Sequence, residues 1–373
     1  MAAHEVQWVL GMMSGTSLDG VDAAMLLTDG RSILSFGSTA YRPYDAALQT
    51  RLRAALGSWD PDPGLGRSVV EEHLACIAEI SEAPAPALIG FHGQTIAHEP
   101  AGRGTLQIGS GLELAMQSGI ETVWDFRSAD VALGGQGAPL ASFYHHALAR
   151  YIGADAPTVF LNLGGVGNLT WVDPSIEDPA EAGACIAFDT GPANAPINDL
   201  VAARLGQPFD RNARLARKGK ADMALVAKFL ERSYFKKMPP KSFDRNDFAD
   251  CIEAVDALGD ADAAATLTAL AAASVARGME HCPRAPGRVL VSGGGRKNPL
   301  LMAMLDAGVD ARVEPVEAVG LDGDMIEAQA FAFLAARVKR GLPTSSPTTT
   351  GVSAAVGGGQ ISAPGRRPKR ECV

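Results

Sequence analysis

Short runs of apolar residues alternate with glycine-rich turns along the chain, and this pattern predicts buried β-strands. In the first half the runs fall at residues 6–10, 21–27, 31–41, 87–91 and 120–124. In the second half they fall at residues 158–163, 169–172, 184–188 and 288–291. A strand, a glycine loop and a return strand open each half, which suggests two domains of related fold.

Longer stretches between these strands predict helices, so the chain is of the α/β class. The expected helices cover residues 44–56, 69–80, a short piece before 118, a stretch around 145–146, segments up to 204, 213–218, 221–234, 247–254, 261–281, a stretch from 299, and 325–340. A change of composition predicts the domain boundary near residues 135–150, with domains of residues 1–140 and 141–344. Residues 345–350 and 357–359 are interpreted as low-complexity connectors.

The stretch of residues 11–22 concentrates three glycines, three hydroxyl residues and the carboxylates of Asp19 and Asp22 between two predicted strands. Glycines let main-chain N–H groups approach a ligand, and consecutive N–H groups form an anion-binding nest. Hydroxyls add donors to phosphate oxygens, and the aspartates can hold Mg²⁺ directly or through water. An ordinary hairpin loop is the alternative, because Gly, Ser and Asp are common in turns. The length of the stretch favours a nucleotide or sugar-phosphate site.

Composition and charge argue against several classes of function. The chain has 373 residues and a formal net charge of −9, which argues against a nucleic-acid partner. The basic residues 366–370 are interpreted as a solvated end. No apolar run reaches the ~18 residues needed to cross a bilayer, and residues 1–5 do not resemble a signal peptide. Five widely spaced cysteines without a CxxC pair fit a reducing cytoplasm with neither disulfides nor zinc.

Asp189 is the strongest catalytic candidate. It follows an apolar strand and precedes Thr190, Gly191 and Pro192, so we expect a fixed carboxylate at an open turn. Such a carboxylate can take a proton from a hydroxyl or from a water molecule near a phosphoryl group. The structural alternative is an Asx-turn or a helix N-cap.

A second glycine run lies at residues 292–298, between a predicted strand and a predicted helix. It has neither the P-loop ending nor the spacing of a dinucleotide site. Its glycines would let a base or ribose lie close to the main chain, and the following helix terminus suits phosphate. A tight structural turn remains the alternative.

Asp125, Arg127 and Glu327 are further candidates. Arg127 either pairs with Asp125 or clamps an anionic substrate group. Glu327 starts a predicted helix, so it is either a helix-dipole residue or a second catalytic carboxylate. The spacing of His92 and His98 does not suggest a metal pair, and the absence of a GxSxG motif leaves acyl hydrolysis without support.

Eight motifs occur in one order along the chain. They are residues 15–22, His92 to Thr95, Asp125 to Arg127, Gly134 to Leu140, Asn162 to Gly165, Phe188 to Pro192, Ser292 to Asn298, and Glu327 with Ala328. Together they resemble the anhydro-N-acetylmuramic acid kinase family over about residues 7–360. The resemblance implies two related actin-like ATPase (ribonuclease H-like) domains with an ATP cleft between them. The segment from about residue 345 to 373 is expected to return to the first domain.

The resemblance also implies a reaction. Water opens the anhydro bridge of 1,6-anhydro-N-acetylmuramate at C1, while O6 accepts the γ-phosphoryl group of ATP. It implies that Asp189 is the base for that water, with Glu327 as a second catalytic residue. His92, Gln94, Asp125 and Arg127 would bind the sugar, and Asp19 or Asp22 would hold Mg²⁺. A cytoplasmic homodimer is also implied.

The ATP site implied by the resemblance is built from the glycine loops of both halves. Its expected members are Gly15, Thr16, Ser17, Leu18, Asp19, Gly20, Val21, Asp22, Gly164, Gly165, Gly191, Gly293, Gly294, Gly295 and Asn298.

One position departs from the family pattern. Ala193 replaces the glycine that usually follows the Asp-Thr-Gly-Pro motif, and it would restrict a backbone of positive φ by about 1 kcal/mol. Two other functions remain open. One is a kinase of the same fold acting on another sugar or on a carboxylate. The other is an ATP-gated binding protein of the Hsp70 or actin kind.

Overall fold

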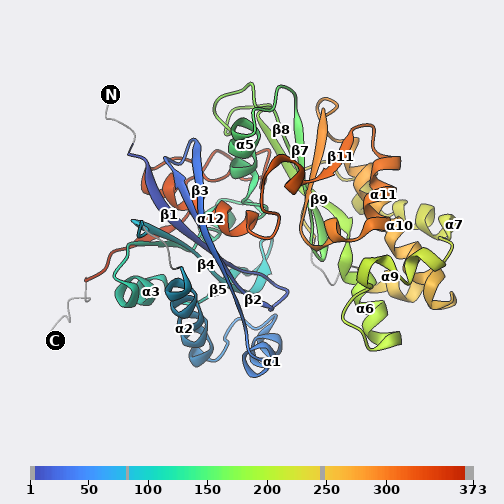
Figure 1. The fold of residues 1–373 in the computed structure, drawn as a ribbon, viewed down its shortest axis with the longest axis horizontal. Helices are drawn as coiled ribbons and strands as arrows, with labels where there is room; N and C mark the ends of the chain where they lie inside the picture. Colours follow the sequence, from blue (N-terminus) through green and yellow to red (C-terminus); the bar gives the residue numbers. More distant parts are fainter. Residues whose placement is uncertain (1–4, 81–83, 244–247, 366–373) are drawn as a thin grey trace. The chain divides into compact units, whose positions relative to one another are not determined.

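The computed structural model describes residues 5–80, 84–243 and 248–365, and it divides into two compact units (Figure 1). The first unit takes the described residues up to Tyr151, together with Met325–Pro347 and those from Gly351 onward. The second takes Ile152–Asp324 and Thr348–Thr350. The start of the expected helix 247–254 and the basic cluster 366–370 lie outside the described residues.

The sheet of the first unit has the strand order β12-β6-β4-β1-β2-β3, and β5 pairs with β4. Its strands are β1 (Gln7–Ser14), β2 (Gly20–Thr28), β3 (Ile33–Pro43), β4 (Leu88–Glu99), β5 (Gly104–Ile108), β6 (Thr122–Trp124) and β12 (Gln360–Ser362). Strands β1, β2 and β3 form an antiparallel series, whereas β4 runs parallel to β1 and β6 runs parallel to β4.

The sheet of the second unit has the order β11-β10-β7-β8-β9. Its strands are β7 (Thr158–Leu163), β8 (Val166–Val172), β9 (Cys185–Pro192), β10 (Arg288–Ser292) and β11 (Arg312–Pro315). Three antiparallel strands again come first, and the fourth strand lies parallel beside the first of the series. The same arrangement in both units confirms two related α/β domains of the actin-like, ribonuclease H-like type.

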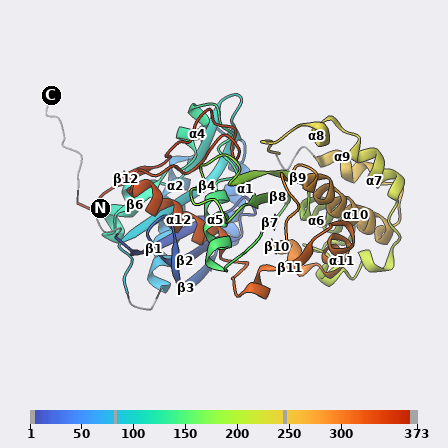
Figure 2. The same ribbon diagram turned by 90° about the horizontal axis from the view of Figure 1, so that it is seen from above.

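Helices cover both faces of the first sheet. They are α1 (Ala46–Ala55), α2 (Pro63–Glu79), α3 (Gly111–Ser118), α4 (Ser128–Ala132), α5 (Ser142–Tyr151) and α12 (Ile326–Lys339). On one face, Leu10 and Met12 share a core with Leu52 and Val69 of α1 and α2. On the other face α12 packs against β1, β2 and β4 (Figure 2). A Cβ atom at Gly11 would overlap the carbonyl oxygen of Ala328, so this packing requires glycine.

The second unit has an additional helical layer. Its α-helices are α6 (Asn194–Leu205), α7 (Met223–Leu230), α8 (Ser233–Lys236), α9 (Ala249–Ala254), α10 (Asp260–Met279) and α11 (Pro299–Gly308). Ala271 and Val275 of α10 pack with β-strand residues and with α11, whereas Ala263 and Leu267 pack among α6 to α9. Because its alanine side chains are small, α10 can pack closely against the sheet and α11 on one side and against α6 to α9 on the other. No helix in the described ranges is long and apolar enough to cross a membrane.

The observed units differ from the boundaries expected at residues 140 and 344. Helix α5 lies in the first unit, and α12 also belongs there because its main chain lies against Gly11 and Gly90. The Ser/Thr segment of residues 344–350 is not a loose connector. Most of its side chains are buried, and the Ala187 N–H donates to the carbonyl oxygen of Thr348.

Several strands are longer than the apolar runs predicted. β1 continues to Ser14, β4 to Glu99 and β9 to Pro192, whereas β5, β11 and α4 were not predicted. The polar and glycine residues at these strand ends still pair with their neighbours. As a result, the loop expected over residues 11–22 is a short turn from Gly15 to Asp19.

Candidate active site

The expected site residues gather at one edge of each sheet. Strands β1, β4 and β6 are parallel, so the turn after Ser14, the segment after Phe91 and the segment after Trp124 lie at the same edge. In the second unit, β7, β9 and β10 point the same way and bring their glycine turns to one edge. Ligands of α/β proteins bind at the carboxyl ends of strands. Each unit therefore carries its own group of candidate residues.

The Gly15–Asp19 turn has the features of a phosphate-binding nest. Thr16, Ser17 and Asp19 are exposed, whereas Leu18 is buried with a φ of 60° and anchors the turn. Within the described chain, no residue accepts a hydrogen bond from the main-chain N–H groups of Thr16 and Ser17. Free, exposed N–H groups next to a hydroxyl side chain are suited to phosphate oxygens. Gly20, Val21 and Asp22 lie in β2 instead of the turn.

Two side chains and one main-chain N–H group donate hydrogen bonds that hold the shape of this turn. The Gln94 Nε2 donates to the Gly15 carbonyl oxygen at 3.1 Å. The Tyr44 N–H and the Tyr41 hydroxyl both donate to the carbonyl oxygen of Asp19, at 2.9 and 3.2 Å. Gln94 was expected to bind the sugar, but its side chain is fully buried and bonded to the turn. Gln94 therefore supports the turn in this structure.

Asp19 and Asp22 form a donor set that fits Mg²⁺. The carboxylates of both residues raise the pKa of Tyr41, after burial as the main cause, so both lie near this ring. The described residues contain no cluster of three or more His, Cys, Asp or Glu that could hold a metal by itself. Mg²⁺ commonly takes one or two carboxylates and completes its shell with water and phosphate. Two aspartates beside a phosphate nest match that requirement.

Arg127, His92 and Glu327 come together in the first unit. The Arg127 Nε donates to His92 Nε2 at 3.1 Å, and its Nη1 donates to the Gly137 carbonyl oxygen at 2.7 Å. Burial lowers the pKa of Arg127 to about 10, and the nearby carboxylates of Glu327 and Asp130 oppose that decrease. Glu327 is exposed in the first turn of α12.

His92 acts as a neutral acceptor for the guanidinium. Burial is the main reason that its pKa lies well below the usual range, and the charge of Arg127 adds to the decrease. Its Nδ1 lies 2.7 Å from the Gly93 carbonyl oxygen, to which it donates. His92 is itself buried, so it orients Arg127.

Asp125 does not pair with Arg127, contrary to one of the two expectations. Its Oδ1 accepts a hydrogen bond from the Ser128 hydroxyl, and its Oδ2 accepts one from Gln360 Nε2 at 2.8 Å. Both oxygens therefore accept hydrogen bonds that stabilise the local fold, and the expected sugar contact of Asp125 stays a prediction. The sequence missed Asp130, whose Oδ1 accepts from the Gly137 N–H at 2.7 Å and so fixes the segment that contacts Arg127.

Asp189 lies inside β9, not at the open turn that was expected. Its Oδ1 accepts from Asn168 Nδ2 at 2.7 Å, and its Oδ2 accepts from the Phe243 N–H at 2.8 Å. Burial raises the pKa of Asp189 to about 6, although both hydrogen bonds lower it. A carboxylate with this pKa is ionised at neutral pH and is still a useful base.

The turn at Gly164 and Gly165 holds the start of α6. The Asn194 N–H donates to the Gly164 carbonyl oxygen, and the Ala193 N–H donates to that of Gly165, both at 3.0 Å. Ala193 has a φ of −125°, so the penalty expected for a positive φ does not apply at this position. Gly191 has a φ of 146°, and a Cβ atom there would lie 2.9 Å from that of Ser274.

The glycine run after β10 forms a 3-10 turn, Gly294–Lys297. Gly293 has a φ of 71° and Gly295 lies against Leu163, whereas space is open around the position of a Cβ at Gly294. Asn298 was expected at the nucleotide, but its Oδ1 caps α11 by accepting from the N–H groups of Leu300 and Leu301.

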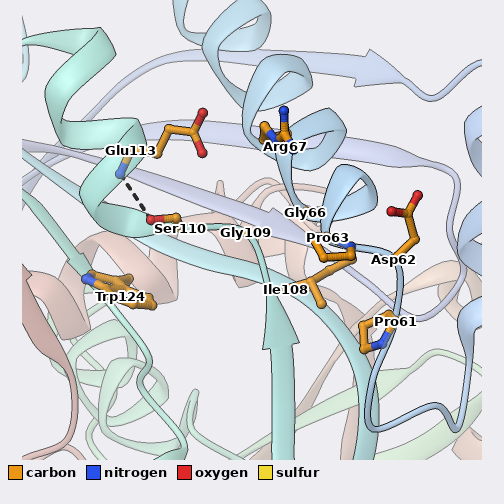
Figure 3. Close-up of a pocket in the computed structure, with 10 residues that line it drawn as sticks. All are labelled: Pro61, Asp62, Pro63, Gly66, Arg67, Ile108, Gly109, Ser110, Glu113 and Trp124. Carbon is orange, nitrogen blue, oxygen red and sulfur yellow. Dashed lines mark hydrogen bonds between the residues drawn. The ribbon is translucent and has the colours of Figure 1, made fainter.

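A surface hollow of about 410 Å³ lies elsewhere in the first unit (Figure 3). It is lined by Pro61, Asp62, Pro63, Gly66, Arg67, Ile108, Gly109, Ser110, Glu113 and Trp124. None of the expected site residues lines it, so this hollow is separate from the candidate active site.

The duplicated sheets, with glycine turns at the same edge of each, define a protein of the actin-like class of ATPases and sugar kinases. The chain matches the model of the family described as anhydro-N-acetylmuramic acid kinase over residues 7–364, and it belongs to that family.

Relatives with that same name are similar over nearly the whole chain. The anhydro-N-acetylmuramic acid kinase of Ruegeria sp. (strain TM1040) is 59% identical and covers 95% of this chain and 94% of its own length. That of Cereibacter sphaeroides is 60% identical and covers 96% of both. Among solved structures, a ROK family glucokinase from Streptomyces griseus in complex with glucose and AMPPNP has a TM-score of 0.42 at 14% identity, covering 88% of this chain and 98% of that chain.

Proposed function

We propose that this protein uses ATP and water to convert 1,6-anhydro-N-acetylmuramic acid into N-acetylmuramic acid 6-phosphate and ADP. Water adds to C1 and the bond from C1 to the bridging O6 breaks. O6 then forms a bond to the γ-phosphorus of ATP as the bond to ADP breaks. Family membership supports the choice of substrate. The observation that supports the mechanism is the buried carboxylate of Asp189, which two hydrogen bonds hold in place.

Asp189 is the proposed base for the attacking water. Its pKa of about 6 leaves it ionised at neutral pH, and its two hydrogen bonds fix the direction of the carboxylate. It would take one proton from the water as the new C1–O bond forms. A buried carboxylate held in a fixed orientation is suited to this step, and Asp189 is such a group.

Arg127 and Glu327 are the proposed sugar-binding residues of the first unit. The Arg127 guanidinium is the cation that would attract the carboxylate of the muramic acid side chain, with His92 holding its orientation. Glu327 is an exposed acceptor for sugar hydroxyls. Asp125 and Gln94 are left out of this assignment, because Asp125 accepts hydrogen bonds that stabilise the local fold and the buried Gln94 donates its Nε2 to the turn.

The Gly15–Asp19 turn is the proposed site of the ATP phosphates. Thr16 and Ser17 would donate their main-chain N–H groups, and Thr16 also its hydroxyl, to phosphate oxygens. The Ser17 hydroxyl donates to Asp19 Oδ1 at 2.6 Å. Mg²⁺, when bound by Asp19 and Asp22, would offset negative charge on the phosphates. We extend the proposal to a cytoplasmic homodimer, for which the family resemblance is the support and sedimentation of the purified protein is the test.

ATP consumption with three sugars tests the proposed function. The substrates are 1,6-anhydro-N-acetylmuramate, N-acetylmuramate and glucose, each with the wild type and with Asp189→Asn. We expect turnover with the anhydro sugar alone and its loss in the variant. Equal turnover with glucose would show that the protein is a kinase but that the anhydro sugar is not its specific substrate. Tight ATP binding without turnover of any sugar would favour the ATP-gated binding protein.

A further inference from the structure

Two donors from distant parts of the chain hold the Asp189 carboxylate, one on each oxygen. We propose that Asn168 and the segment Lys241–Phe243 are positioning residues that aim Asp189 at the attacking water. This inference rests on the proposed function, because it needs Asp189 to be the base. The two donors belong to this chain's own fold and lie outside the motifs that carried the family resemblance.

Asn168 is placed by the hairpin of β8 and β9. It lies directly opposite Asp189 across the strand pair, so both side chains point to the same face of the sheet. The register shifts between Gly167 and Asn168, and the Thr190 hydroxyl donates to the Gly167 carbonyl oxygen at 3.2 Å. A Cβ atom at Gly167 would lie 2.5 Å from the Thr190 hydroxyl oxygen, so glycine is needed at this irregularity. The hairpin thus fixes the amide donor.

The segment Lys241–Phe243 holds Asp189 at two points. The Asp189 N–H donates to the carbonyl oxygen of Lys241 at 2.9 Å, and the Phe243 N–H returns a hydrogen bond to the side chain of Asp189. The hydroxyl of Tyr234 also donates to the carbonyl oxygen of Asp189. One short segment therefore fixes both the main chain and the carboxylate of the base.

The side chain of Lys241 anchors that segment. It is only 8% exposed, and its Nζ lies 4.7 Å from the ring centre of Tyr234 and 5.7 Å from that of Phe188. Its Nζ is also 3.2 Å from His281 Nε2. In the part of the chain that the structure describes, no carboxylate forms an ion pair with Lys241. Burying a cation without a carboxylate partner costs free energy. The contacts of the Lys241 side chain with these rings and with His281 hold the segment in place.

The two hydrogen bonds leave part of the acceptor capacity of the Asp189 carboxylate unused. Each oxygen has one donor from the protein, so each retains acceptor capacity toward a water molecule. A hydrogen bond to the charged form lowers the pKa of a carboxyl group, so loss of either donor raises it. Loss of a donor also lets the carboxylate rotate. Both effects act on the rate of the chemical step and not on substrate binding.

The test compares Asn168→Ala and Lys241→Met with the wild type in steady-state turnover of the anhydro sugar across pH. We expect kcat to fall 10- to 100-fold in Asn168→Ala, with both KM values within threefold. The acid limb of the kcat/KM profile should move upward by about one pH unit. Lys241→Met should move the limb in the same direction. Thermal unfolding confirms that each variant is folded.

Asn194→Ala is the matched control. Asn194 lies at the same edge of the same unit, but its Nδ2 donates to the carbonyl oxygens of Leu163 and Gly164, not to a carboxylate. The acid limb of the kcat/KM profile of Asn194→Ala should stay at the wild-type pH. If Asn168→Ala folds poorly, Asn168→Ser and Lys241→Met carry the same comparison.

A double variant separates this proposal from the proposed function. Adding Asn168→Ala to Asp189→Asn should cause no further loss of kcat, because a positioning residue acts through the base. A further 10-fold loss, or an unchanged acid limb in Asn168→Ala, would overturn the positioning role. Full activity of Asp189→Asn would instead overturn the base itself, and an inactive wild type would overturn the proposed function.

Discussion

At the scale of single residues, the contacts and burial of each polar side chain come from the fold. Asp125 and Asp189 both follow strand residues, and each accepts one hydrogen bond on each carboxylate oxygen. Burial raises the pKa of Asp189 to about 6. The sequence predicted Asp189 as a candidate because an apolar run leads to it. It could not identify Phe243, whose N–H comes from 54 positions further along the chain.

The pKa of Asp189 predicts a pH dependence of stability. Folding raises this pKa above 3.8, so the neutral form is favoured in the folded state. The stabilisation from Asp189 is therefore complete below about pH 4 and is lost as pH rises through about 6. The free energy of unfolding, measured by urea denaturation, should fall relative to Asp189→Asn by on the order of 2 kcal/mol over that window. A difference that does not vary with pH would contradict this.

Arg127 predicts a selective effect on the sugar. Lysine cannot reproduce its fork of donors to His92 and Gly137. Arg127→Lys should raise the KM for the anhydro sugar at least tenfold and leave the KM for ATP within threefold. Steady-state kinetics with each substrate varied in turn measures both. An equal rise in both KM values would show that Arg127 supports the fold more broadly.

At the scale of elements, close packing of α12 explains features that the local pattern could not show. Gly11 was interpreted as part of a phosphate loop because it precedes further glycines and hydroxyl residues. In the structure it lies within β1, against the main chain of α12. The partner helix comes from more than 300 positions away along the chain, so no local pattern could separate a packing glycine from a ligand-binding one.

Gly11→Ala tests this packing. The added methyl group would overlap main-chain atoms of α12, which cannot move independently of their helix. We expect a loss of roughly 3 kcal/mol or more in the free energy of unfolding, typical of severe overpacking. Gly308→Ala is the control, because Gly308 ends α11 with open space around it. Chemical denaturation should leave the control within about 1 kcal/mol of the wild type. Equal effects at both positions would argue against the packing role.

At the scale of the whole molecule, the repeated strand order is what the sequence predicted best. The recurrence of strand, glycine loop and strand indicated two related domains, and both sheets have that arrangement. The boundaries were harder, because α12 and the Ser/Thr segment reach their sheets through contacts distant in sequence. The buried Ser/Thr segment has a composition typical of a connector, and only its tertiary contacts show otherwise.

Nucleotide binding should stabilise the whole molecule. ATP with Mg²⁺ should raise Tm in a concentration-dependent way, because a ligand that binds only the folded state stabilises it by mass action. Excess EDTA should reduce that shift, and the double variant Asp19→Asn with Asp22→Asn should do the same in the presence of Mg²⁺. Differential scanning fluorimetry measures these shifts. The same Tm rise with and without Mg²⁺ would exclude these aspartates as a metal site.

The position of the water oxygen in the product shows whether water opens the anhydro ring. The protein is incubated with ATP and the anhydro sugar in ¹⁸O-water, and the product is quenched early and examined by mass spectrometry. A sample of N-acetylmuramic acid 6-phosphate held in the same water corrects for exchange at C1. We expect one ¹⁸O atom on C1 of each product molecule and none in its phosphate. Label in the phosphate, or a phosphorylated product that keeps its anhydro ring, would contradict it.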